Sequence, residues 1–209
     1  MVYSKSRIQK DYAKVAWVYD FWSFLTETRA LKKSLEFAEI KDKEAVLEVA
    51  VGTGRAFKKI VELNPNGRNE GIDISEDMIK VARKRLRKYK HFKLKRGEAG
   101  KLPYKSNSFD ILINSFMLDL LPEKDYKAIL KEYKRVLKKN GRVVITTMTN
   151  GREWYSRFWD MVARKFPAVL TGCRPVDLEK EIKKAGFTIE KSEYITQNTF
   201  PSLVIYAGK

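Results

Sequence analysis

The chain of 209 residues is 44% hydrophobic and 33% charged, so it has enough apolar side chains for a packed core and is not a disordered polymer. Lys and Arg number 43 against 26 Asp and Glu, and the net charge of +17 favours an anionic partner such as nucleic acid, a membrane surface or a phosphorylated substrate. One cysteine and one histidine exclude an intramolecular disulfide, a cysteine metal cluster and any site that needs two imidazoles.

Neither a signal peptide nor a membrane span is expected. Met1 to Lys10 has three basic residues and no apolar run, and the longest uncharged stretch, Tyr194 to Gly208, is 15 residues long and partly polar. We therefore expect a cytoplasmic protein, with peripheral attachment to a membrane as the alternative. The many charges are also typical of thermophile proteins. The oligomeric state stays open, and no metal site is expected.

Short apolar runs alternate with charged, helix-like patterns, which predicts an α/β domain with a largely parallel sheet. The expected strands are Ala45–Ala50, Arg68–Asp73, His91–Lys95, Phe109–Asn114, Arg142–Thr147, Phe187–Tyr194 and Ser202–Ala207. The expected helices are Arg55–Leu63, Ser75–Lys88, Glu123–Lys138 and Val176–Ala185. Ser75 suits a helix cap, and Lys139-Asn140-Gly141 suits a helix stop.

Two aromatic-rich segments fall outside this alternation: a helical cap at residues 1–40 and an insertion at residues 152–173, after the fifth strand. All four tryptophans lie in them. In the insertion, Tyr155, Trp159 and Val162 recur at helical spacing. Both segments either pack on the sheet, or form a lid over a pocket or a helix at a lipid interface. Tyr12, Trp22, Trp154, Tyr155 and Trp159 are the aromatic candidates for substrate binding.

The most informative stretch runs from Glu48 to Gly54, where a buried-strand pattern enters a Gly-x-Gly turn and then a helix. Glycine lets the backbone approach a ligand closely. Asp73 ends the next strand, 19 residues after Gly54, a distance that suits hydrogen bonds to ribose hydroxyls. Phe57 stands where a dinucleotide site has its third glycine, and there is no P-loop lysine. The pattern predicts a nucleoside site without a pyrophosphate and disfavours a nicotinamide-dependent oxidoreductase.

Five segments in order resemble the class I S-adenosylmethionine-dependent methyltransferases. They are Glu48–Gly54, Gly71–Met78, Gly97–Tyr104, Ser108–Leu121 and Arg135–Arg142, the last with Lys139 and Asn140 in place of Pro and Gly. The resemblance covers nearly the whole chain. It implies one domain over residues 1–209, a Rossmann-like three-layer sandwich with a seven-stranded, mostly parallel sheet, one antiparallel strand and helical lid segments.

The same resemblance implies S-adenosyl-L-methionine as the cofactor and assigns its site. Gly52, Thr53 and Gly54 would approach the methionine part, with Glu48 ordering the loop, and Asp73 would hold the ribose. Adenine would lie between Ile74 and Met78, with its edge read by Glu98 and Ala99, and Asn114 and Ser115 would lie beneath the sulfonium. Met78 could equally be an ordinary core residue.

Methyl transfer asks mainly for positioning, although an acidic acceptor also needs a base. His91, between lysines at a strand start, is a poor candidate. Asp119 lies where relatives often have a catalytic polar group after the fourth strand, although it could be a cap or a surface acid. Tyr19 is a second catalytic candidate. Arg174 could bind a phosphate or carboxylate, or lie on the surface.

Residues 80–96 contain ten Lys or Arg and no acid. They predict a solvated face, an RNA-binding surface or a docking site for anionic lipid. The opening Val18 to Ser23 resembles the ubiquinone and menaquinone biosynthesis methyltransferases, and bacterial phospholipid N-methyltransferases are similar in pattern. A small or lipophilic acceptor is therefore expected, of the quinone-precursor or phospholipid-headgroup type. The alternatives are an RNA methyltransferase and a non-catalytic cofactor-binding module.

Overall fold

A computed structural model describes residues 24–165 and 173–209 of the chain. The helices are α3 (Thr28–Ala38), α4 (Arg55–Leu63), α5 (Glu76–Arg85), α6 (Tyr126–Val136), α7 (Arg157–Lys165) and α8 (Glu179–Lys184), with short 3-10 turns η1 (Leu118–Leu120) and η2 (Glu123–Asp125). The strands are β1 (Ala45–Val49), β2 (Arg68–Asp73), β3 (Phe92–Arg96), β4 (Phe109–Ser115), β5 (Leu137–Met148), β6 (Thr188–Gln197) and β7 (Phe200–Gly208).

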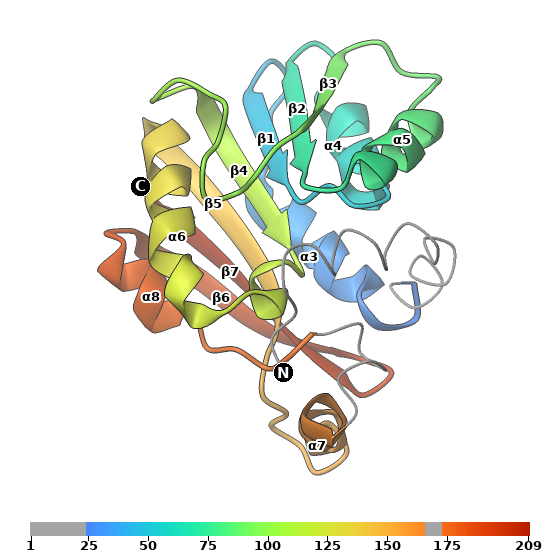
Figure 1. Ribbon diagram of the computed structural model, residues 1–209, viewed down its shortest axis with the longest axis vertical. Coiled ribbons are helices and arrows are strands. Elements are labelled where there is room, and N and C mark those ends of the chain that lie inside the picture. The colour runs from blue at the N-terminus through green and yellow to red at the C-terminus, as the bar shows by residue number, and fades with distance from the viewer. Residues whose placement is uncertain (1–23, 166–172) are drawn as a thin grey trace.

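These strands form one seven-stranded sheet in the order β3-β2-β1-β4-β5-β7-β6 (Figure 1). The pairs from β3 to β5 are parallel, whereas β7 is antiparallel to both β5 and β6. The expected Rossmann-like sheet with one antiparallel strand is confirmed. Because β1 connects outward to β2 while β4 lies on its other side, the strand order reverses between β1 and β4, where such sheets bind their ligands.

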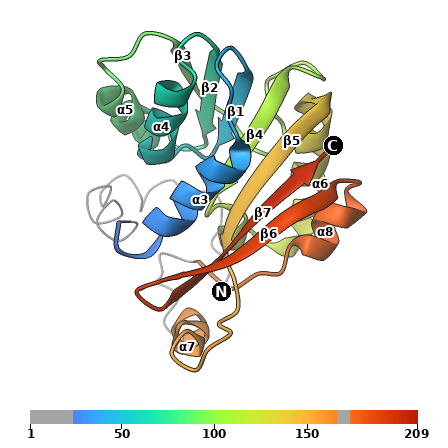
Figure 2. The ribbon, with the colours of Figure 1, turned by 180° about the vertical axis from the view of Figure 1, so that it is seen from behind.

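Helices cover both faces of the sheet, giving three layers (Figures 1 and 2). Buried residues of α3, α4 and α5 pack with Val46, Ile111 and Val144 on one face. Those of α6 and α8 pack with Leu47, Leu112 and their neighbours on the other. Successive residues of a central strand thus point alternately into the apolar core on one face of the sheet and into the core on the other face. Both sets of side chains are therefore apolar, which explains the continuous apolar runs in the sequence of these strands. None of the helices in the described ranges has the length and apolar composition needed to cross a membrane.

The end of α6 corrects one expectation. The helix ends at Val136 and β5 begins at the next residue, so Lys139-Asn140-Gly141 is not a helix stop but an irregular start to the strand. The reason lies in the neighbouring chain. The amides of Asn107 and Ser108 donate to the carbonyls of Arg135 and Val136 at 2.9 and 2.7 Å, and so satisfy the helix end before the glycine is reached.

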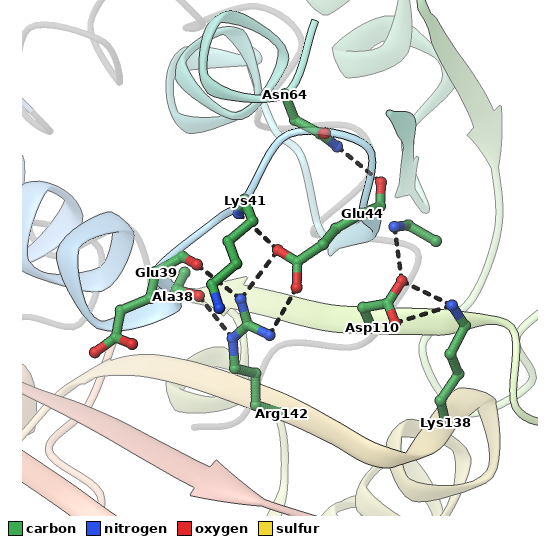
Figure 3. A network of polar contacts seen from close by, with 9 residues as sticks. Ala38, Glu39, Lys41, Glu44, Asn64, Asp110, Lys138 and Arg142 are labelled. Atoms are coloured by element: carbon green, nitrogen blue, oxygen red, sulfur yellow. Dashed lines mark hydrogen bonds and ion pairs between the residues drawn. The ribbon is translucent and has the colours of Figure 1, made fainter. Parts of the chain in front are cut away.

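A polar network fixes the amino-terminal edge of the sheet (Figure 3). The Arg142 guanidinium donates to the carbonyl of Ala38 at 2.7 Å and forms an ion pair with Glu44 at 3.0 Å, which ties α3 to β5. Asp110 accepts from the amide of Ala45 at 2.9 Å. These contacts stabilise the edge opposite the ends of β1, β2 and β4 that form the candidate site.

Candidate functional site

A cavity of about 260 Å³ lies at the carboxyl ends of β1 to β4. Its lining combines Val49 and Ala50 after β1, Ile72 to Ile74 of β2, the loop 97–101 after β3, residues 117, 120 and 121 after β4, and the first turn of α6. A second part shares Ala50, Asp73, Ile74, Met117 and Leu120 with the first. The additional residues of this second part are Gly52, Ser75, Met78, Ser115 and Phe116. The two parts therefore form one site at the point where the strand order reverses.

Asp73 is the centre of this site. Its Oδ2 accepts from the amide of Gly52 at 2.8 Å, and its Oδ1 accepts from the amide of Ser75 at 2.9 Å. One carboxylate therefore joins the glycine loop to the start of α5. The Ser75 hydroxyl accepts in turn from the amide of Met78, the expected helix cap. Burial raises the pKa of Asp73, against the backbone amides that stabilise its charged form.

The two glycines of the loop have different surroundings. A Cβ on Gly52, at φ +54°, would meet no heavy atom within 4 Å, and this residue lines the cavity. A Cβ on Gly54, at φ +80°, would lie 3.0 Å from the Cβ of Ala82 on α5. Gly52 therefore leaves room for a ligand, whereas Gly54 allows the close packing of two helices. Ala50 also has a positive φ of +63°, a strained backbone held at the cavity wall.

Other residues expected at the cofactor site divide into two groups. Ile74, Met78, Glu98, Ala99 and Ser115 line the cavity. The remaining three do not appear in its lining: Thr53 accepts from Arg85 at 2.9 Å, Asn114 donates to the carbonyl of Val49 at 2.8 Å, and Glu48 lies buried in β1. Burial and the charge of Asp73 raise the pKa of Glu48. Thr53 therefore joins the loop to α5, and Asn114 joins β4 to the end of β1.

One polar atom at the end of β4 is suited to a ligand. The buried Ser115 hydroxyl has no hydrogen-bond partner among the described residues, and Ser115 lines the cavity. The Asn114 Oδ1 also has no partner there, but Asn114 is fully buried and does not line the cavity. An unsatisfied buried polar atom costs roughly 1–3 kcal/mol, which a ligand's polar group at the Ser115 side would recover. No group of three or more metal-ligating side chains occurs in the described part of the chain.

Asp119 requires a correction. Its carboxylate is fully buried and is not part of the cavity lining described above. Oδ2 accepts from the amide of Met148 at 3.0 Å, and the Cys173 thiol is a further hydrogen-bond partner. The carboxylate thus joins η1 to the end of β5 rather than facing an acceptor. Burial raises the pKa of Asp119 to about 7.

The raised pKa predicts a pH-dependent stability. A carboxyl that binds its proton more tightly when folded than when unfolded makes stability fall as pH rises between the two pKa values, here 3.8 and about 7. Relative to Asp119→Asn, the wild-type protein should lose up to about 4 kcal/mol of unfolding free energy from pH 4 to pH 7. Urea unfolding of both proteins across this pH range measures the difference between their free energies of unfolding. The contributions of the other carboxylates are the same in both proteins and cancel in this difference. A difference that stays constant with pH would contradict the assignment.

Arg174 also differs from its expected role in substrate binding. Its guanidinium donates to the carbonyl of Leu121 at 2.8 Å and to the Tyr126 hydroxyl at 2.9 Å, and it lies 3.4 Å from Glu123. The arginine therefore holds the turn before α6 and has carbonyl, hydroxyl and carboxylate partners already. Its first partners lie about fifty residues earlier in the chain, so no local pattern could reveal them.

The aromatic candidates do not wall the cavity described above. Trp154 is 84% exposed, Tyr155 is at the surface, and Trp159 packs on Phe200 with ring centroids 5.7 Å apart. Tyr12, Tyr19 and Trp22 lie outside the described residues. Sequence reasoning missed Met117, Leu120 and the first turn of α6 as cavity walls. Their only signal was their place after β4, because the crossover from β4 to α6 passes over the strand ends.

The basic segment 80–96 covers most of α5 and the edge strand β3, and none of its residues lines either part of the cavity. Three of its cations have acidic partners: Lys80 with Asp77 at 3.0 Å, Arg83 with Glu76 at 3.5 Å, and Lys95 with Glu70 at 3.5 Å. Lysines on an edge strand also oppose pairing with another chain. Part of this charge therefore has a structural use.

The chain resembles known proteins in its sequence and in its fold. The "Methyltransferase domain" family profile matches residues 40–197. A demethylmenaquinone methyltransferase of Listeria welshimeri is 29% identical over 163 residues, which are 74% of this chain and 68% of that protein.

Two solved structures share the fold. A Haloferax volcanii methyltransferase in complex with the Trm112 methyltransferase activator is 16% identical, with a TM-score of 0.77 over 96% of each chain. The geranyl diphosphate C-methyltransferase of Streptomyces coelicolor, solved with Mg²⁺, geranyl diphosphate and S-adenosyl-L-homocysteine, is 14% identical. Its TM-score is 0.70 over 87% of this chain and 79% of that one.

Proposed function

Because the chain belongs to the Methyltransferase domain family and is a class I S-adenosylmethionine-dependent methyltransferase, we propose that its acceptor is a small lipophilic molecule of the quinone-precursor type. The name of the Listeria relative supports an aromatic acceptor with an apolar tail. The observation that carries the proposal is one wall of the second part of the cavity, which is formed by Phe116, Met117 and Leu120. This wall is apolar, and among the described residues that line the second part, Asp73 is the one that carries a charge.

We assign the cofactor site to the residues around Asp73. The cofactor is a nucleoside without a pyrophosphate, and it supplies an activated methyl group on a sulfonium. The Asp73 carboxylate, already aligned by Gly52 and Ser75, would accept from the ribose hydroxyls. Ile74 and Met78 would hold adenine between apolar surfaces, with Glu98 and Ala99 at its edge. Gly52 and Ser115 would lie at the amino-acid end, where the open side of the glycine and the unsatisfied hydroxyl leave room.

The acceptor side follows from the remaining wall. Phe116, Met117 and Leu120 present apolar surface beside the proposed cofactor site. A phosphorylated or nucleic-acid acceptor would bring negative charge to this wall without a cation to receive it, at a large desolvation cost. An apolar aromatic ring would instead gain free energy by leaving water. Positioning of the two reactants against each other then contributes to the rate.

A pair of defined acceptors tests the proposal. The methyl group is electrophilic, so the acceptor carbon must be electron-rich, and the reduced form of a demethylated naphthoquinone is the suitable probe. We expect labelled methyl to enter the prenylated naphthoquinol at least about tenfold more efficiently than the same ring without its tail, because the tail adds buried apolar area. Equal rates of methylation of the two rings would contradict the proposal of a lipophilic acceptor. Label in added RNA, with none in either ring, would favour the basic segment 80–96 as the substrate surface.

A further inference from the structure

One helix exposes large apolar side chains to solvent. Trp154 and Tyr155 precede α7 and Phe158 and Met161 lie on it, with exposed fractions of 84, 37, 52 and 42%. We call these four residues, three aromatic side chains and one methionine, the aromatic face. In the described parts of the chain, two other large hydrophobic residues are comparably exposed, and they lie far apart in the sequence. Isolated exposed apolar residues are ordinary, whereas four together mark an interaction surface.

The opposite side of α7 is already packed, so the aromatic face is not the helix's inward side. Val162 is buried, and the Trp159 indole nitrogen donates to the Thr199 hydroxyl at 2.8 Å, in the turn between β6 and β7. The Tyr194 hydroxyl of β6 contacts Glu153 at 3.1 Å and Ser156 at 3.3 Å. The hairpin therefore holds α7 at the periphery of the domain, where both figures of the ribbon place it (Figures 1 and 2).

Aromatic rings connect this helix to the cofactor cavity. Phe158 contacts Trp159 with centroids 5.7 Å apart, Trp159 contacts Phe200 at 5.7 Å, and Phe200 contacts Phe116 at 6.5 Å. Phe116 lines the second part of the cavity. A continuous series of apolar side chains thus runs from the exposed helix to the place where we put the acceptor.

The charges beside the aromatic face have the sign that suits an anionic surface. Arg152 and Arg157 are exposed, and the Arg152 guanidinium lies 4.4 Å from the centre of the Tyr194 ring. One of the acids in this stretch, Glu153, faces inward against Tyr194 and Ser156. Exposed aromatic residues flanked by arginines are the composition of helices that lie in a membrane interface, where apolar burial and attraction to acidic lipids act together.

We propose that the aromatic face, with Arg152 and Arg157, docks on the surface of an anionic lipid bilayer and presents the cavity to acceptors dissolved in that bilayer. This inference rests on the proposed function, because it gives a lipophilic acceptor its source. The docking itself needs neither turnover nor cofactor, so the two can be tested apart.

The experiment measures binding to vesicles of phosphatidylglycerol and phosphatidylcholine in equal parts, and to phosphatidylcholine alone. The wild-type chain should bind the acidic vesicles more tightly. Trp154→Ser with Phe158→Ser should weaken that binding by at least about tenfold, since two aromatic side chains no longer leave water. Arg157→Glu should weaken it about fivefold for each unit of charge changed. Leu63→Ser, which removes a 49% exposed residue of α4, is the matched control and should bind like wild type.

Two further readouts separate the possible failures. The affinity for S-adenosylmethionine should be the same in all variants, which shows that each one is folded and that the cofactor site is intact. Equal vesicle binding by wild type and the double variant, or no binding to acidic vesicles, would overturn the docking proposal even if lipophilic acceptors are methylated. Sedimentation that shows a wild-type dimer and a double-variant monomer would also overturn it and assign the aromatic face to a second copy of the chain.

Discussion

Asp73→Ala is expected to weaken the binding of S-adenosylmethionine about a hundredfold. The carboxylate oxygens accept backbone amides from Gly52 and Ser75, with Ile74 as a further backbone partner, and the acceptor capacity that remains is available to a ribose hydroxyl. A hydrogen bond to a charged group contributes roughly 1.5–3 kcal/mol, and the upper part of this range corresponds to the expected loss. The free energy of unfolding should change less, because removing Asp73 also removes the negative charge that raises the pKa of buried Glu48.

Isothermal titration calorimetry with the cofactor measures this loss, and thermal unfolding shows that the variant is folded. Asp77→Ala is the matched control, since Asp77 is an acid in the same first turn of α5 but is exposed and bonded to Lys80. It should leave the affinity unchanged. A folded Asp73→Ala protein that binds the cofactor like wild type would show that the ribose assignment is wrong.

The second large effect is a contrast between the two loop glycines. Gly54→Ala should lower the free energy of unfolding by about 2–4 kcal/mol, because an alanine at φ +80° is strained and its Cβ would lie about 3 Å from Ala82 and Leu86. Gly52→Ala has only the backbone strain, about 1 kcal/mol, since its Cβ would meet no neighbour within 4 Å. That methyl group would instead occupy space at the cavity wall and weaken cofactor binding.

Urea unfolding and cofactor titration of both variants measure the contrast. We expect Gly54→Ala to lose mainly stability and Gly52→Ala to lose mainly affinity. The opposite result, a stable Gly54→Ala protein and an unfolded Gly52→Ala protein, would mean that the loop geometry is wrong.

The sequence predicted the sheet well because period and burial are strong signals in central strands. The bounds of β2 and α4 agree with the expected ranges, and Ser75 caps α5 as its hydroxyl and position indicated. The end of α6 was predicted wrongly because its last carbonyls accept from Asn107 and Ser108, far away in the sequence. A hydrogen-bond partner so far away in the sequence cannot be recognised from the residues around the helix end.

The candidate site was predictable to the level of its loops but not of every side chain. Asp73 and Gly52 follow from spacing, since strand ends meet at one edge of a parallel sheet. The direction of the Asp119 side chain could not be predicted from spacing, because η1 turns its carboxylate toward the amide of Met148. The contacts of Arg174 could not be predicted either, since they depend on tertiary packing. The difference between Gly52, which faces open space, and Gly54, which allows close packing, also depends on Ala82, a residue on another helix.

Methyl transfer to a lipophilic acceptor is tested most directly by the partition of a labelled methyl group between cell fractions. The purified protein is incubated with methyl-labelled S-adenosylmethionine and a total cell extract, which is then separated into organic, aqueous small-molecule and nucleic-acid fractions. Asp73→Ala provides the background. With the wild-type protein we expect label in the organic fraction, and with the variant we expect none there. Label confined to the nucleic-acid fraction, or cofactor binding with no transfer to any fraction, would contradict methyl transfer to a lipophilic acceptor.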